Sequence, residues 1–188
     1  MLNTIISSLF LFLKNITHNT IILGFRNWLL QTLNMSRKGD IPEIILKDEK
    51  AKISDAFYGS SDDFYDSLSI AIQSNQWAQN DKLRDALEGV LMRLCAKYLF
   101  LEKRRNFALD PVANFHLRNG ATMWRLNWWA DLSARGLTNS CGIMVNYRYY
   151  LDNLENNSTT YQEKKVIDAS EQIRQLASLS LDNRTSKL

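Results

Sequence analysis

The sequence predicts an α+β fold within the mixed α/β class, mostly helical and with one β-hairpin. Two observations support this prediction. Apolar residues recur at helical spacing through most of the chain, most regularly over Asp81 to Arg105. Around Asn119-Gly120 the spacing changes to alternation, and Asn-Gly is the preferred dipeptide of a two-residue hairpin turn. The 188 residues are enough for one domain with a hydrophobic core.

Composition and charge exclude several classes of protein. The formal net charge of +3 is too small to indicate a nucleic-acid-binding protein. The apolar run from Ile5 to Leu13 is too short for a membrane span, which needs roughly 20 residues. Cys95 and Cys141 lack the spacing of a metal site, so we expect no bound metal and two buried thiols in a reducing compartment.

Three helices are expected in the first half of the chain. The segment 24–34 reads as a short amphipathic helix, and Pro42 suits the first turn of a second one. A third helix follows in "SDDFYDSLSIAIQS", where an acidic first turn complements the helix dipole. The inward residues of the first and third helices are Phe25, Trp28, Leu29, Leu33, Phe64, Leu68 and Ile72.

The strongest helical pattern runs from Asp81 to Arg105. Asn80 or Asp81 can cap its start, and a basic cluster, Lys103 to Arg105, complements the negative end of the helix dipole. One stripe of this helix is apolar and faces the core. It consists of Leu83, Leu87, Val90, Leu91, Leu94 and Tyr98.

The hairpin prediction pairs Val112–Arg118 with Ala121–Ala130 across the turn at Asn119-Gly120. Side chains alternate between the two faces of a strand, so this register sorts them into two rows. The apolar row contains Phe115, Leu117, Trp124, Leu126 and Trp128. The polar row contains Asn114, His116, Met123, Arg125 and Asn127. A helix from about Thr138 and a final helix over Ser158–Leu179 complete the predicted elements, the last with Tyr161, Val166, Ile167, Ile173 and Leu176 inward.

His116 is the main candidate for a functional side chain. A single histidine is more often structural than catalytic, but hydrogen bonds from Asn114 and Arg125 in the polar row would fix its tautomer. No local serine–histidine–acid spacing and no glycine-rich phosphate loop accompany it. A run of charge at a helix end is usually solvated, so we interpret the basic cluster as structural.

The segment "LDPVANFHLRNGA", followed by "NSCGIMVNYRY", resembles the C-terminal signature of the malonyl-CoA decarboxylase family. The resemblance extends from about Gly24 to the terminal "SKL", which animal members of the family also carry. It implies the C-terminal part of a GNAT-like acyl-CoA fold. The family is implied to convert malonyl-CoA to acetyl-CoA and carbon dioxide without cofactor, and to form homo-oligomers when full-length.

The resemblance assigns one role in the chain and leaves another unfilled. The histidine of the family's "NFH" motif is regarded as the proton donor, and it falls on His116. Tyr147 and Tyr149 are near enough in sequence to reach such a site, although aromatic core is the stronger interpretation. The family's catalytic serine, its CoA-binding loops and its helical oligomerisation domain lie upstream of the "GFRNWL" match. We therefore expect a partial chain.

The expected organisation has three parts. Residues 1–23 form an unmatched leader, which is either the apolar part of a signal peptide or a disordered or incorrectly assigned start. Residues 24–185 are the C-terminal portion of the catalytic domain. Residues 186–188, Ser186, Lys187 and Leu188, match the tripeptide read by the peroxisomal import receptor, which contradicts secretion. The mitochondrion and the cytoplasm are further expected locations.

Two other functions stay open at this point. The chain can be a catalytically inactive remnant that binds a partner helix or a full-length subunit. Alternatively, it can be an acyl-CoA acyltransferase, since one fold hosts many activities. Product analysis separates the second alternative, because a transferase needs an acceptor and releases no carbon dioxide.

Overall fold

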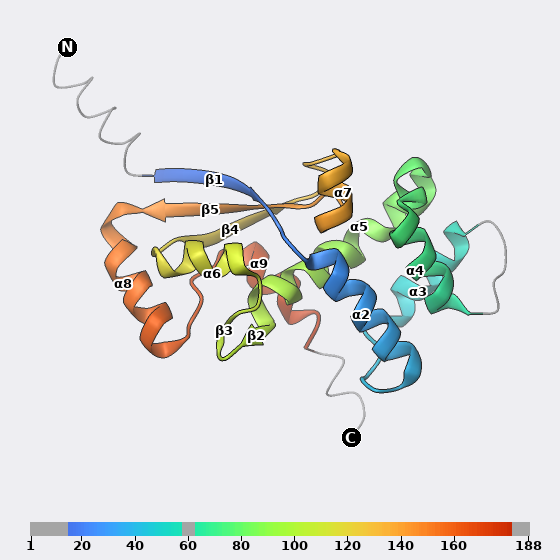
Figure 1. The fold of residues 1–188 in the computed structure, drawn as a ribbon, viewed down its shortest axis with the longest axis horizontal. Helices are drawn as coiled ribbons and strands as arrows, with labels where there is room; N and C mark the ends of the chain where they lie inside the picture. Colours follow the sequence, from blue (N-terminus) through green and yellow to red (C-terminus); the bar gives the residue numbers. More distant parts are fainter. Residues whose placement is uncertain (1–14, 58–62, 182–188) are drawn as a thin grey trace, which may run out of the picture.

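The computed structural model describes residues 15–57 and 63–181 (Figure 1). Figure 1 shows a three-stranded sheet on one side of the molecule and a helical half, α2 to α5, on the other. The strands are β1 (Asn15–Ile21), β2 (Lys103–Arg104), β3 (Phe107–Ala108), β4 (Thr122–Asn127) and β5 (Met144–Tyr150). The helices are α2 (Phe25–Lys38), α3 (Lys47–Ala56), α4 (Phe64–Ser74), α5 (Asp81–Ala96), α6 (Pro111–Arg118), α7 (Ala134–Ser140), α8 (Leu154–Thr159) and α9 (Glu171–Ser178). Short 3₁₀ turns (Gln76–Gln79, Leu151–Asn153) and π-helical turns (Lys97–Leu101, Thr160–Lys164) extend the helices.

The predicted mixed fold is confirmed, but the predicted hairpin is wrong. The segment taken as its first strand is helix α6. The Asp110 carboxylate accepts hydrogen bonds from the backbone N–H groups of Val112 and Ala113, and Pro111 occupies the first turn. An acidic cap followed by proline starts a helix, and seven alternating residues are too few to outweigh that local signal.

The Asn119-Gly120 pair ends helix α6 instead of turning a hairpin. Gly120 has a φ of 79°, and its N–H donates to the carbonyl of Leu117. The N–H of Ala121 donates to the carbonyl of His116, which completes the hydrogen-bond pattern of a glycine-terminated helix. The same left-handed backbone serves both turn types, so this dipeptide did not distinguish them.

Strand β5 takes the place that the prediction gave to residues 112–118. The prediction of a helix from Thr138 is wrong after Ser140. Helix α7 ends there because Cys141 and Gly142 both have positive φ. The alternating aromatic run that follows is β5. The sheet order is β1-β5-β4, and both strand pairs are antiparallel. On β5, Tyr147 pairs with His18 of β1 on one side and with Met123 of β4 on the other.

Residues 15–23, assigned in the sequence to an unmatched leader, contribute strand β1 and the start of the core. Strand β1 pairs with β5 along its whole length, from Asn15 opposite Tyr150 to Ile21 opposite Met144. Ile22 is fully buried. The N-terminal segment of the described chain is therefore part of the sheet that carries the candidate site.

The helices predicted from apolar spacing are confirmed at 25–38, 64–74 and 81–96. All six residues of the predicted apolar stripe are buried, five of them on α5 and Tyr98 in the turn that follows it, and Asn80 caps α5 through its side chain. The α5 helix stops earlier than expected, however. Lys103 and Arg104 form strand β2, and Arg105 has a φ of 52° in the following turn. The basic cluster is therefore not the end of a helix.

Two further helix boundaries differ from the prediction. Pro42 does not start a helix, because α3 begins at Lys47 after an extended segment. The final helix is broken at Lys165, which has a φ of 60°, and Ser170 caps the separate helix α9. As a result Val166 is 51% exposed, although the single-helix pattern placed it inward.

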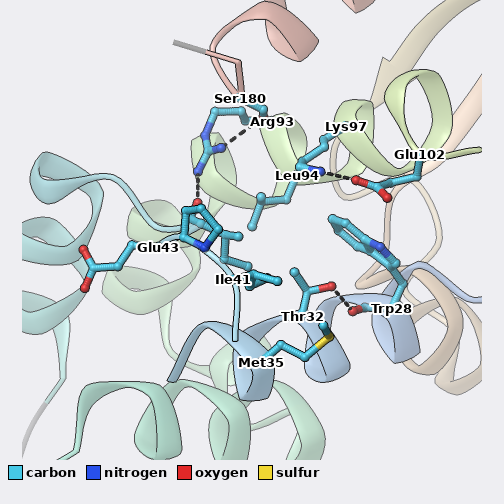
Figure 2. A pocket seen from close by; sticks show the side chains of 12 residues that line it. Trp28, Thr32, Met35, Ile41, Glu43, Arg93, Leu94, Lys97, Glu102 and Ser180 are labelled. Atoms are coloured by element: carbon cyan, nitrogen blue, oxygen red, sulfur yellow. Dashed lines mark hydrogen bonds and ion pairs between the residues drawn. The ribbon is translucent and has the colours of Figure 1, made fainter. Parts of the chain in front are cut away.

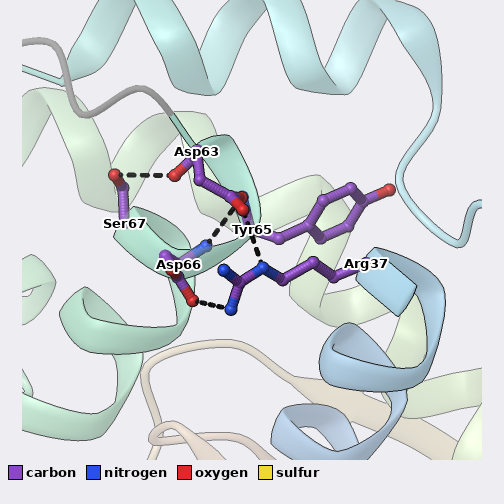
Figure 3. Close-up of polar contacts among 5 residues, drawn as sticks. All are labelled: Arg37, Asp63, Tyr65, Asp66 and Ser67. Carbon is purple, nitrogen blue, oxygen red and sulfur yellow. Dashed lines mark hydrogen bonds and ion pairs between the residues drawn. The ribbon is translucent and has the colours of Figure 1, made fainter.

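The N-terminus of α4 is fastened to the C-terminus of α2 by charged groups (Figure 3). The Arg37 guanidinium donates to the Asp63 carboxylate at 2.7 Å and also pairs with Asp66. Asp63 in turn accepts from the backbone N–H groups of Tyr65 and Asp66, as an N-cap does. This network is structural and lies in the helical half of the molecule.

Candidate active site

The candidate active site lies where helix α6 meets strands β5 and β1. His116 is 7% exposed, and its Nδ1 atom lies 2.6 Å from the Tyr149 hydroxyl oxygen. Its imidazole stacks on the Tyr147 ring, with 4.3 Å between ring centroids and 11° between planes. The predicted orientation of His116 was therefore wrong. The histidine faces aromatic rings, while its neighbour Phe115 is 61% exposed.

A buried carboxylate anchors the helix that carries His116. Asp110 is 1% exposed and, besides capping α6, accepts a 3.3 Å hydrogen bond from the Tyr98 hydroxyl. Burial raises the pKa of Asp110, and the hydrogen bonds from Ala113, Tyr98 and Val112 partly offset that rise. Tyr98 belongs to the turn that follows α5. The strongest predicted helix thus fixes the start of α6, and with it the place of His116.

The environment favours the neutral form of both partners in the His116–Tyr149 hydrogen bond. Burial lowers the pKa of His116, and the nearby His18 imidazole lowers it further. Burial also raises the pKa of Tyr149, which keeps its hydroxyl protonated at neutral pH. A protonated hydroxyl can donate to Nδ1, and the ring proton of neutral His116 then resides on Nε2. Nε2 is the ring nitrogen that Tyr149 does not engage.

Sequence analysis missed His18, the second histidine of the chain. It projects from β1 on the same face of the sheet as Tyr147 and is exposed. Its ring centroid lies 6.2 Å from that of His116 and 5.8 Å from that of Tyr149, edge to face with the latter. No local pattern marks His18, because only the pairing of β1 with β5 brings it to the site.

The structure does not form the predicted polar row of Asn114, His116 and Arg125. The Asn114 side chain accepts a 2.8 Å hydrogen bond from the Tyr161 hydroxyl and ties α6 to the turn after α8. Arg125 is exposed and is paired with Asn146, one position away from Tyr147 on β5, so it lies on the opposite face of the sheet.

Other predicted features fall in different places. Cys95 and Cys141 are buried free thiols, as expected. Within residues 15–57 and 63–181, no three His, Cys, Asp or Glu side chains are grouped so as to hold a metal ion. In the same ranges no helix is long and apolar enough to cross a membrane. The targeting tripeptide Ser186, Lys187 and Leu188 lies outside the described residues.

One cavity lies apart from His116. It has a volume of about 520 Å³ and opens between α2, the 41–44 segment and the end of α5 (Figure 2). Two ion pairs border it, Lys97 with Glu102 and Arg93 with Glu49, and Arg93 also donates to the Ser180 hydroxyl and the Ile44 carbonyl. The Lys97 and Arg93 side chains are therefore paired within the protein, and Glu43 is a further charged residue that lines the cavity.

A smaller cavity of about 280 Å³ lies at the turn between β2 and β3. Arg104, Arg105 and Asn114 are among its lining residues. It adjoins the start of α6, although His116 is not among its lining residues. Neither of these cavities is lined by His116, so the candidate active site rests on the side-chain geometry around His116.

A family model and individual relatives point to the same protein family. A family model described as "Malonyl-CoA decarboxylase C-terminal domain" matches residues 6–187. The chain is 51% identical over 155 residues to "Malonyl-CoA decarboxylase, mitochondrial" of Rattus norvegicus, covering 82% of this chain and 31% of that protein. It is 44% identical over 168 residues to the protein of the same name from Anser anser anser, covering 89% of this chain and 32% of that protein. The chain thus spans about a third of the length of these relatives.

Solved structures agree with the sequence comparison. The malonyl-CoA decarboxylase of Rhodopseudomonas palustris superimposes with a TM-score of 0.68 at 28% identity, covering 87% of this chain and 33% of that one. The enzyme of Cupriavidus metallidurans gives a TM-score of 0.66 at 29% identity, covering 93% and 42%. The family match includes both the candidate site on α6 and β5 and strand β1. This chain belongs to the malonyl-CoA decarboxylase family.

Proposed function

We propose that this chain provides the proton-donating part of a malonyl-CoA decarboxylase site, which converts malonyl-CoA to acetyl-CoA and carbon dioxide. The observation that carries the proposal is the fixed geometry of His116 in the "NFH" motif. Its ring is stacked on Tyr147 and held by Tyr149 at 2.6 Å, in the chain of a decarboxylase family. Both contacts fix the orientation of the imidazole before any substrate binds.

The chemistry requires one proton for each turnover. When the carboxylate leaves as carbon dioxide, the electron pair of the broken C–C bond passes to the thioester as an enolate. The enolate then takes a proton at its α-carbon to give acetyl-CoA. The imidazolium form of His116 supplies that proton from Nε2 and is left as neutral imidazole, and general acids of this kind contribute roughly 10²–10⁴-fold to a rate. The thioester carbonyl accepts the electron pair, so this route needs neither a metal nor an organic cofactor.

Tyr149 acts on this step through His116. By occupying Nδ1, its hydroxyl leaves Nε2 as the donating atom and prevents rotation of the ring. The Tyr147 ring stacks against the imidazole and is fully buried. Neither Asn114 nor Arg125 is included in the proposed site, because their positions in the structure separate them from the imidazole.

The test is steady-state turnover of malonyl-CoA by the chain and by its His116→Asn variant, with products identified. Because His116 is buried, asparagine is a better replacement than alanine, which would leave a larger cavity. Release of carbon dioxide and acetyl-CoA by the parent chain, lost roughly 10²–10⁴-fold in the variant, is the expected result. Acyl transfer without carbon dioxide would indicate a transferase. Malonyl-CoA binding without turnover would indicate a non-catalytic member of the family.

The expected location and assembly state follow from separate features. The rat and goose relatives are named as mitochondrial proteins, and the last three residues of this chain match the peroxisomal import tripeptide. We propose that the protein acts in peroxisomes through the import receptor, and also in mitochondria. We further propose that the full-length form is a homo-oligomer.

A further inference from the structure

The two histidines of this chain lie together in the folded protein, although one is near the start of the described residues and the other is on α6. Strand β1 places His18 opposite Tyr147, the residue on which His116 stacks. The His18 and His116 ring centroids are 6.2 Å apart. The His18 and Tyr149 rings pack edge to face, with 5.8 Å between their centroids. His18 therefore borders both members of the proposed proton-donating pair.

We propose that His18 is a positioning residue of this site, which holds the His116 imidazole neutral until an anionic acyl thioester is bound. The proposal rests on the proposed function. His18 is the solvent-exposed member of the pair and His116 the buried one. A positive charge is less costly on the exposed ring, because water solvates it there. Two imidazolium ions this close repel each other, so a positive charge on His18 disfavours a second charge on His116.

Among the residues that the structure describes, the other groups on the elements packed against His116 do not take over this role. From β5, Tyr147 and Tyr149 face the imidazole, and burial raises the pKa of both, so they stay uncharged. On its own helix, Arg118 lies over the Phe107 ring, and Asp110 is engaged by backbone N–H groups and Tyr98. Burial comes first among the causes that lower the pKa of His116, and the His18 charge is the other.

The consequence for catalysis is that His116 becomes protonated only when the substrate binds. The malonyl carboxylate brings one negative charge beside the two imidazoles, which offsets their repulsion and allows His116 to take up a second proton at Nδ1, where the Tyr149 hydroxyl oxygen then accepts the hydrogen bond. Once carbon dioxide has left, the enolate carries that negative charge until His116 protonates the α-carbon. His116 is then neutral again and is recharged from solvent by way of His18. One solvent proton is consumed for each carbon dioxide released.

The test is an NMR titration of the imidazole signals, which needs no turnover. The chain has two histidines, so the variants His18→Gln and His116→Asn each leave one signal and assign both. In His18→Gln the titration midpoint of His116 should move to higher pH. The shift is expected because the His116 ring then no longer faces a positive charge on His18.

A control variant on β1 separates the effect of the His18 charge from a general effect of substitution in this strand. Thr17→Ala is the matched control, since Thr17 lies on the opposite face of β1 and its replacement should leave both midpoints unchanged. An unchanged or lowered His116 midpoint in His18→Gln overturns the role of His18. A raised His116 midpoint in a chain without malonyl-CoA turnover would instead count against the proposed function. In an active chain, His18→Gln should displace the acidic limb of the pH profile of kcat/KM.

Discussion

The Tyr149 hydroxyl lies 2.6 Å from Nδ1 of His116, across 33 positions of sequence and between a strand and a helix. This contact links the proposed proton donor to the central strand of the sheet. It depends on strand β5, an element for which the sequence predicted a helix.

Replacing Tyr149 by phenylalanine should lower kcat roughly 100-fold, because the imidazole loses the contact that orients it while the aromatic packing is kept. The measurement is kcat and KM for malonyl-CoA, with KM expected to change little. Tyr150→Phe is the control, since it removes a hydroxyl from the opposite face of the same strand. Equal kinetics for both variants would contradict an orienting role for Tyr149.

The buried histidine should make the free energy of unfolding depend on pH near neutrality. The pKa of His116 is lowered in the folded state from its ordinary value of 6.5. The unfolded chain therefore binds a proton more readily as the pH falls below about 6.5, and the folded state loses stability until its own lower pKa is reached. Above about pH 6.5 both states bind no proton at His116, so its contribution to stability no longer changes with pH.

Urea unfolding at pH 7.5 and at pH 5.5 measures this difference. We expect the parent chain to be less stable at pH 5.5, and the His116→Asn variant to show a smaller loss. A His116→Asn variant with the same pH dependence as the parent would mean that other groups govern it.

Gly120 should be among the least replaceable glycines of the chain. It has a φ of 79°, and a Cβ atom there would lie 2.1 Å from the backbone oxygen of Leu154. Gly120→Ala should destabilise the fold by more than the roughly 1–2 kcal/mol that left-handed backbone costs a non-glycine residue. Gly89→Ala is the matched substitution, in open space on α5, and should stabilise by about 1 kcal/mol. Denaturant midpoints of the two variants should therefore move in opposite directions.

Deletion of Leu188 tests the targeting proposal. A fluorescent fusion that ends in Ser186, Lys187 and Leu188 should enter peroxisomes, and the fusion that lacks Leu188 should not, because the import receptor reads the complete tripeptide at the chain end. Microscopy with a peroxisomal marker measures the difference. Peroxisomal location without Leu188 would show that another signal is in use.

The sequence alone determined those features that depend on neighbours along the chain. Helices α2, α4 and α5 were predictable because residues three and four positions apart share a face, and the side chains of Asp63 and Asn80 cap their own helices. The sequence also indicated the family, since the "NFH" motif is contiguous, and it selected His116 from that motif. These signals need no knowledge of distant contacts.

Only the tertiary structure decided how His116 is used. Strand pairing joins residues far apart in sequence, so the choice of β5 rather than residues 112–118 as the partner of β4 left no local mark. That choice placed Tyr147 and Tyr149 against the imidazole, moved Arg125 to the opposite face, and brought His18 to the site through β1. The sequence contained both histidines, but their approach results from the order of three strands, which the packing of the whole domain determines.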